Sequence, residues 1–146
     1  MEERARFEWD DRFLLGHAGM DDTHREFVDL VDALLTAEES DLPVVLAAFL
    51  AHAEAHFAAE NHLMESHDFP PRDCHIDEHD KVLASVKEVQ QLLTDGDTTL
   101  VRELAMALMD WFPAHADYMD SALATWLVKR AHAGAPLVLR RNQVKT

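Results

Sequence analysis

The stretch AHFAAENHLM, residues 55–64, places an imidazole and a carboxylate one helical turn apart. It is rich in alanine and has neither glycine nor proline, so it predicts a helix. Apolar residues recur at steps of three and four through this region, which is typical of a helix with one buried face. His56 and Glu60 fall inside that face, whereas His52 and His62 lie on its margins. The apolar members of the face are Leu46, Phe49, Leu50, Ala53, Phe57, Leu63 and Met64.

The same periodicity and clear helix breakers predict three further helices around this one. Glycines in GHAGMDDTH, residues 16–24, indicate a loop before the first helix, and Pro113 predicts an irregularity inside the last one. The predicted boundaries are a cap at Asp21 or Asp22 for the first helix, Pro43 in the first turn and an end near Ser66 for the second, residues 74–93 for the third, and a cap at Asp97 or Thr98 with an end near Ala131 for the fourth.

Short connections between these helices predict an all-α, up-down-up-down antiparallel four-helix bundle. The 146 residues suit a single domain: an N-terminal arm at residues 1–20, the bundle at about 21–131, and a short C-terminal tail at about 132–146. The arm contains Phe7, Trp9 and Phe13 and is too apolar for a solvated segment. We therefore expect it to pack on the bundle.

The composition excludes several classes of partner. A formal net charge of −15 disfavours nucleic acids and anionic membranes, which need basic surfaces. The charged N-terminus does not resemble a signal peptide, and no uninterrupted apolar run approaches the length of a membrane span. The one cysteine, Cys74, leaves no internal disulfide framework. These features predict a cytoplasmic protein without a membrane segment.

Histidines fall on the predicted core face of every helix. A single inward histidine is more often a hydrogen-bonded core residue than a ligand. Several of them beside a buried carboxylate would be costly unless they shared a metal, and bundles do bring ligands from facing helices together in this way. The inward set is His24, His56, Glu60, His75, His79 and His115.

Five histidines are too many for one tetrahedral zinc ion, so two metals sharing bridging carboxylates are the better interpretation. Glu60 is one such carboxylate, and the other should come from HADYMD, residues 115–120. Asp120 lies about 140° around an ideal helix from His115, so the two side chains point in different directions. They would point to the same side only if a π-type bulge widened the turn. Asp117 is placed worse. Spacing alone leaves both residues open, and each could simply be a surface charge.

These residues resemble the hemerythrin family, in particular single-domain bacterial hemerythrins. The likeness covers roughly residues 7–127: an aromatic arm, then a histidine in MDDTHREF, then HFAAE, then HIDEH, then HADYMD, with WFPAH before the last histidine. It implies a non-haem di-iron centre and selects Asp120 over Asp117. The implied ligands are His75, His79 and His115 on one iron and His24 and His56 on the other, with Glu60, Asp120 and an oxo or hydroxo group as bridges.

The resemblance also implies a function, which is reversible O2 binding for storage, delivery or sensing. O2 would bind as a hydroperoxide at the open position of the two-histidine iron. Small anions and nitric oxide are further candidate ligands, and the protein is expected to be a monomer. We expect an apolar pocket around the ligands. Its candidate residues are Phe27, Phe57, Trp111, Phe112 and Ala116, each of which could also serve as plain core packing.

The sequence departs from the family pattern, and it leaves two competing functions open. Asn61 stands where a second glutamate is common, and Ala116 stands where a larger aliphatic residue is usual, which predicts a roomier pocket. The competing functions are a di-iron redox enzyme (an oxidase, a peroxidase or a protein that handles nitric oxide) and a structural bundle that holds zinc or no metal. The remaining histidines are expected at the surface: His17, His52, His62, His67 and His132.

Overall fold

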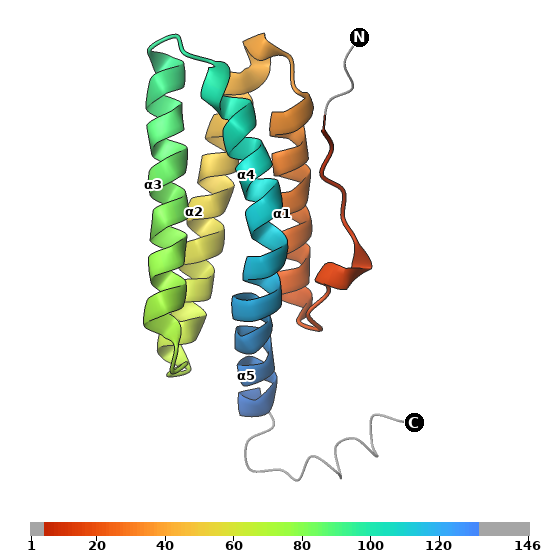
Figure 1. Ribbon diagram of the computed structural model, residues 1–146. Coiled ribbons are helices and arrows are strands. Elements are labelled where there is room, and N and C mark those ends of the chain that lie inside the picture. The colour runs from red at the N-terminus through yellow and green to blue at the C-terminus, as the bar shows by residue number, and fades with distance from the viewer. Residues whose placement is uncertain (1–4, 132–146) are drawn as a thin grey trace.

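The computed structural model describes residues 5–131, and every regular element in that range is helical (Figure 1). The predicted tail at 132–146, including His132, lies outside the described residues. Two short 3-10 turns, Asp11–Phe13 and Glu39–Asp41, precede α1 and α2. The helices are α1 (Ala18–Thr36), α2 (Leu42–Ser66), α3 (Arg72–Thr94), α4 (Thr99–His115), a π-helical segment (Ala116–Asp120) and α5 (Ser121–Ala131).

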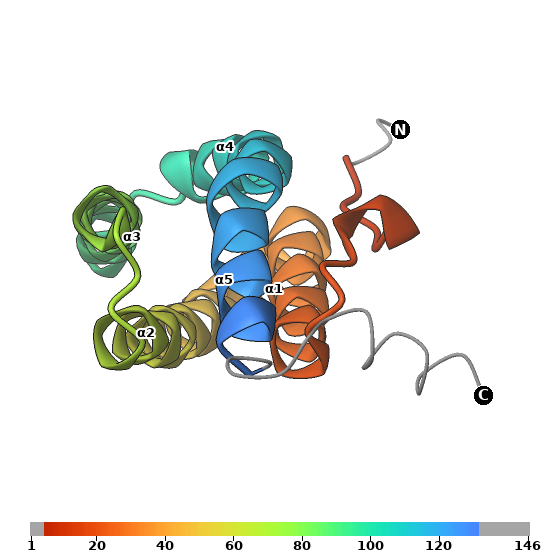
Figure 2. The same ribbon diagram turned by 90° about the horizontal axis from the view of Figure 1, so that it is seen from below.

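The four long helices form an antiparallel up-down-up-down bundle, as predicted (Figure 1). Helix α1 packs on α2, α2 on α3, α3 on α4, and α4 on α1, so the bundle closes into a ring. Viewed from below, α1 to α4 stand around a common interior, and α5 continues α4 beneath it (Figure 2). Side chains from all four helices can therefore meet inside the ring.

Helix α1 begins earlier than the sequence predicts. Its N-cap is His17, whose Nδ1 accepts the backbone N–H of Met20 at 3.2 Å. The carboxylate of Asp21, predicted as a cap, accepts the backbone N–H groups of Leu15 at 2.8 Å and Gly16 at 3.2 Å. Gly16 has φ +82°, a left-handed conformation that glycine adopts readily. The expected loop is therefore confined to residues before Ala18, and Asp21 stabilises that turn from inside the helix.

The N-terminal arm packs on the bundle over the part that the structure describes. Phe7 and Phe13 are both 7% exposed, and each makes an edge-to-face contact with Phe112 of α4. Arg6 forms a two-bond ion pair with Asp32 of α1, whose carboxylate also accepts the backbone N–H of Phe7. The arm therefore covers α1 and α4, which confirms the prediction for its aromatic residues.

The other boundaries lie close to the predicted ones. Helix α2 starts at Leu42 with Pro43 in its first turn, where the missing N–H is not needed. The Asp97 carboxylate accepts the N–H of Thr99 at the start of α4. The irregularity expected at Pro113 occurs three residues later, as the π-helical segment from Ala116.

Two apolar clusters fill the interior. The larger one joins the arm to the upper parts of α1, α2, α3 and α4, and the smaller one surrounds Met64, Phe69 and Leu123 near α5. A layer of buried polar residues separates them. Along α2, for example, Phe57 belongs to the larger cluster, Glu60 is in the polar layer, and Met64 belongs to the smaller cluster.

The segment Glu39–Ser66, which contains α2, is long and apolar enough to cross a membrane by length and composition alone. This differs from the expectation that no segment would reach that length. The reason is its high content of alanine, leucine and phenylalanine with few charges. It packs against α1 and α3 and buries His56 and Glu60, as a helix of a bundle core does.

Arg102 of α4 should be an important tether between α4 and the end of α1. Its guanidinium donates to the carbonyls of Leu34 at 2.8 Å and Leu35 at 2.7 Å, and also to the carbonyl of Ala37. The last carbonyls of a helix lack intrahelical partners and favour a cation. We predict that Arg102→Met lowers the free energy of unfolding by roughly 2 kcal/mol, measured by urea denaturation, and that Arg102→Lys loses less. An unchanged midpoint for Arg102→Met would contradict this role.

Candidate metal centre

All seven ligands predicted from the sequence are buried and meet in the polar layer. None is more than 5% exposed. Helix α1 contributes one residue, α2 and α3 contribute two each, and two more come from the end of α4 and the π-helical segment. In chain order they are His24, His56, Glu60, His75, His79, His115 and Asp120.

The π-helical segment explains how Asp120 reaches the layer. The N–H of Ser121 bonds to the carbonyl of Ala116, a separation of five residues that is typical of a π turn. This wider turn brings the Asp120 carboxylate to 3.2 Å from the Nε2 of His115. Asp117, the alternative that spacing left open, is exposed.

Glu60 lies between two groups of histidines. Its Oε2 is 2.7 Å from the Nε2 of His56 and 3.3 Å from the Nε2 of His24. Its Oε1 is 3.2 Å from the Nε2 of His79 and 3.8 Å from the Nε2 of His75. The two oxygens of one carboxylate thus face different histidine groups.

Asp120 divides its oxygens in the same way. Its Oδ2 is 3.2 Å from the Nε2 of His24, and its Oδ1 is 2.9 Å from the Nε2 of His75 and 3.2 Å from that of His115. Two donors at right angles around a metal at about 2.1 Å are separated by about 3 Å. These spacings therefore match atoms that share an ion.

Unsatisfied polar atoms support the same conclusion. Five of the buried atoms that point at one another in this layer form no hydrogen bond within the described part of the chain, namely Oε1 of Glu60, Oδ1 of Asp120, and Nε2 of His75, His79 and His115. Buried polar atoms without partners are rare in folded proteins. These five residues form one group whose ligand atoms lie within 4.8 Å of one another, and His24, His56 and Glu60 form a second. The donors present can hold two cations that share carboxylates.

The electrostatics of the cluster are dominated by burial and by these contacts. Burial opposes charge on His24, yet its contacts with Asp120 and Glu60 outweigh burial and raise its pKa to about 9. Burial also works against the charged forms of Glu60 and Asp120, but the surrounding imidazoles hold both carboxyl pKa values well below the usual range. Burial lowers the pKa of His79. Both acids are therefore anionic at neutral pH and available as ligands.

Aromatic rings enclose the histidines. Phe57 stacks on His79 with ring centroids 4.0 Å apart, and Trp111 stacks on His115 at 4.2 Å. Two further rings meet the other histidine group edge to face, Phe112 against His24 at 5.2 Å and Phe27 against His56 at 6.0 Å. The fifth residue predicted for the pocket, Ala116, is 2% exposed beside His115. The predicted pocket residues are thus placed around the ligands.

One carboxylate that contacts a histidine of the cluster could not be singled out from the sequence. Glu78 accepts the Nδ1–H of His115 at 2.8 Å and the Nε1–H of Trp111 at 2.9 Å. Its neighbour His79 makes the corresponding contact, at 2.9 Å, with Asn61. The only sign of this contact in the sequence is that Glu78 precedes His79 in HIDEH. A glutamate in that position is equally typical of a helix surface.

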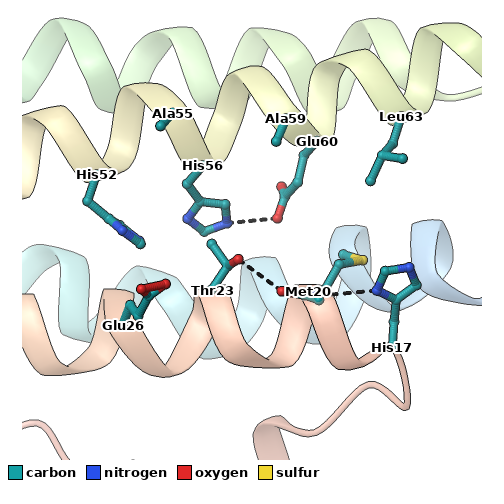
Figure 3. Close-up of a pocket in the computed structure, with 11 residues that line it drawn as sticks. His17, Met20, Thr23, Glu26, His52, Ala55, His56, Ala59, Glu60 and Leu63 are labelled. Carbon is teal, nitrogen blue, oxygen red and sulfur yellow. Dashed lines mark hydrogen bonds and ion pairs between the residues drawn. The ribbon is translucent and has the colours of Figure 1, made fainter.

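A groove between α1 and α2 reaches this layer from outside (Figure 3). Its volume is about 380 Å³, and His56 and Glu60 form part of its lining. Small side chains at Ala55 and Ala59 leave room along its α2 wall. His17 and His52 also line it, and both are partly buried, so the expectation that they are plain surface residues is wrong. Of the other two described histidines outside the cluster, His62 is exposed as predicted, whereas His67 is partly buried and departs from the prediction in the same way.

Comparison with known proteins shows the family to which this chain belongs. The model of the hemerythrin HHE cation binding domain matches residues 15–127. The chain belongs to the hemerythrin family. A bacteriohemerythrin of Ralstonia nicotianae is 46% identical over 123 residues, which covers 84% of this chain and 90% of that protein. A bacteriohemerythrin of Methylococcus capsulatus is 24% identical over 104 residues, 68% of this chain and 79% of that protein.

The fold agrees with a solved member of the family. A crystal structure of a hemerythrin point mutant superposes with a TM-score of 0.75 and covers 82% of this chain and 95% of its own, at 22% sequence identity. At that identity the likeness supports the fold, while the family model and the closer sequence relative support membership. The buried cluster fits the cation binding that the family model describes.

Removing the carboxylate that faces both histidine groups should prevent loading of two ions. We predict two divalent ions per chain in the reconstituted protein and at most one in Glu60→Gln, because a neutral amide is a much poorer metal ligand than a carboxylate. Metal analysis after gel filtration measures the ratio. Glu65→Gln, an exposed change on the same helix, should keep two ions. Two ions in Glu60→Gln would contradict the assignment of Glu60.

Proposed function

We propose that this hemerythrin binds O2 reversibly at a non-haem di-iron centre. The observation that carries the proposal is the division of both buried carboxylates between two histidine groups, since each can bridge two ions. Membership of the family and the 46% identity to a protein named bacteriohemerythrin support it. The donor set supports iron, because imidazoles and carboxylates together suit that metal.

The proposed ligand sets differ between the two irons. His75, His79 and His115 would hold one iron, and His24 and His56 would hold the other. Glu60 and Asp120 would bridge them, together with an oxo or hydroxo group. The iron held by two histidines would have one protein ligand fewer, which would leave a position for O2. When bound, the paired irons would supply the redox chemistry, since electrons pass from them to O2 on binding and return to them on release.

The chain's own contribution is to keep the site dry and its ligands fixed. Phe27, Phe57 and Phe112 are at most 1% exposed, and Trp111 covers the face of His115. Such rings exclude water and free protons, which would otherwise promote loss of reduced oxygen species and leave an inactive oxidised centre. The same rings pack the core, so both roles coincide.

A di-iron redox enzyme is the second candidate, but the donor set disfavours it. Ferritin-like di-iron enzymes use carboxylate-rich sites with paired Glu-x-x-His motifs. This cluster combines five histidines with two carboxylates. We further propose a monomer that acts in the cytoplasm, and the exposed free Cys74 is compatible with a reducing compartment.

Optical spectroscopy tests the function directly. The iron-loaded protein is reduced under argon, exposed to air, and then returned to argon. A carrier should develop a visible charge-transfer band in air and lose most of it when O2 is removed, over several cycles. Rapid conversion to a ferric spectrum that does not reverse would favour redox turnover over carriage. Zinc, or no stoichiometric metal, in protein isolated from cells would contradict the di-iron centre.

Filling the space beside Ala116 should slow autoxidation. Ala116 lines a cavity of about 490 Å³ between the arm and the π-helical segment, one residue from His115. We predict that Ala116→Ile lowers the autoxidation rate of the oxygenated protein several-fold, because it reduces the room for water and anions. Decay of the visible band measures that rate. Ala58→Ile, an exposed change on α2, is the control, and no slowing in Ala116→Ile would refute the prediction.

A further inference from the structure

The two histidine groups differ in what holds their outer nitrogen atoms. In the three-histidine group, Nδ1 of His79 bonds to Asn61 and Nδ1 of His115 bonds to Glu78. In the two-histidine group, neither Nδ1 of His24 nor Nδ1 of His56 has a hydrogen-bond partner within residues 5–131. Nδ1 of His75 also has no partner in this range. Hydrogen bonds therefore orient two of the three rings in the first group and neither ring in the second, and packing alone orients the rest.

Glu78 holds His115 with particular rigidity. One oxygen, Oε1, accepts both the Nδ1–H of His115 at 2.8 Å and the Nε1–H of Trp111 at 2.9 Å. The Trp111 ring stacks on the His115 ring with an interplanar angle of 24°. Glu78 thus fixes the edge of the His115 imidazole by a hydrogen bond. It also anchors the Trp111 indole, which covers the face of the same imidazole.

These contacts have a direct consequence for metal binding. A histidine that donates its Nδ1–H presents an unprotonated Nε2, and a carboxylate acceptor makes that nitrogen a stronger donor to a metal. The Nε2 of His115 faces Asp120, as expected for a ligand atom. His79 is fixed in the same tautomer by Asn61 and by the stacked Phe57 ring at 4.0 Å, although its acceptor is neutral.

We propose that the two metal positions fill in order, with the first ion at His75, His79 and His115 and the second at His24 and His56. Glu78 is the positioning residue that sets the difference. This inference rests on the proposed two-metal centre, but it concerns affinity and order rather than O2. Loss of a contact of this kind lowers metal affinity by about 10–100-fold.

Calorimetry with Co²⁺ tests the order in the metal-free, full-length protein. The wild type should bind one ion tightly and a second more weakly. Glu78→Gln keeps the shape and an acceptor oxygen but removes the charge, and it should weaken the first step by about 10–100-fold, bringing the two steps together. Glu88→Gln, an exposed change on the same helix, should leave both steps unaltered.

Two further measurements separate positioning from folding and assign the order. Circular dichroism and thermal melting of metal-free Glu78→Gln should match the wild type, so that a weaker first step does not reflect a damaged bundle. With one equivalent of Co²⁺, the exchangeable ring N–H signals of His79 and His115 should shift strongly in the proton NMR spectrum, and the His115 signal should exchange faster in Glu78→Gln. His24→Ala should keep the tight step and lose the weak one.

The outcomes distinguish this inference from the function on which it rests. Uptake of fewer than two ions by the wild type would overturn the two-metal centre and the order with it. Two ions bound with equal affinity, or an unchanged first step in Glu78→Gln, would overturn the order and the role of Glu78 while leaving the two-metal centre intact. Loss of the tight step in His24→Ala would show that the order is reversed.

Discussion

The burial of two carboxylates among five imidazoles is the constraint on which this structure depends. Glu60 and Asp120 are at most 3% exposed, and isolated anions in such surroundings would be costly. What compensates them inside the bundle is contact with imidazoles, and those come from four separate helices. The helices must therefore keep one axial register relative to one another, because a shift of one turn would leave an anion without partners. Core polar groups can impose a unique register in this way, and a bound cation would strengthen it.

The apolar packing reinforces this register from both sides of the polar layer. Each helix that supplies a ligand also supplies apolar side chains to the cluster above it or below it. In α1, Met20 belongs to the lower cluster, His24 to the layer and Phe27 to the upper cluster. Along the π-helical segment and α5, Ala116 belongs to the upper cluster, Asp120 to the layer and Leu123 to the lower cluster. The packing of the core therefore also positions the residues of the site. The arm adds to this packing by placing Phe7 and Phe13 on Phe112.

Features with a strict helical period could be predicted from the sequence, and features that depend on other helices could not. Periodicity alone is enough to place His56 and Glu60 on the inner face of α2. Spacing left Asp120 undecided because a π turn is a local deformation that an ideal helix does not contain. The start of α1 was placed too late because Gly16 and Gly19 indicate a loop. The sequence does not show that Asp21 lies inside the helix and accepts the backbone N–H groups that precede it. Glu78 escaped because its partners, Trp111 and His115, lie on another helix.

The arrangement of the helices gives the polar layer two different sides. On one side hydrogen bonds fix the histidines, and on the other a groove makes the layer accessible. Helices α3 and α4 meet through Glu78, which bonds to two residues of α4 and leaves the ligands there little freedom. Between α1 and α2, small side chains leave room for a groove instead, and this groove reaches His56 and Glu60 (Figure 3). A centre that must keep its metals while exchanging a small ligand benefits from this asymmetry. In the proposed centre, the hydrogen-bonded histidines would retain one ion, while His56, one of the less constrained histidines, lies on the side from which the layer is reached.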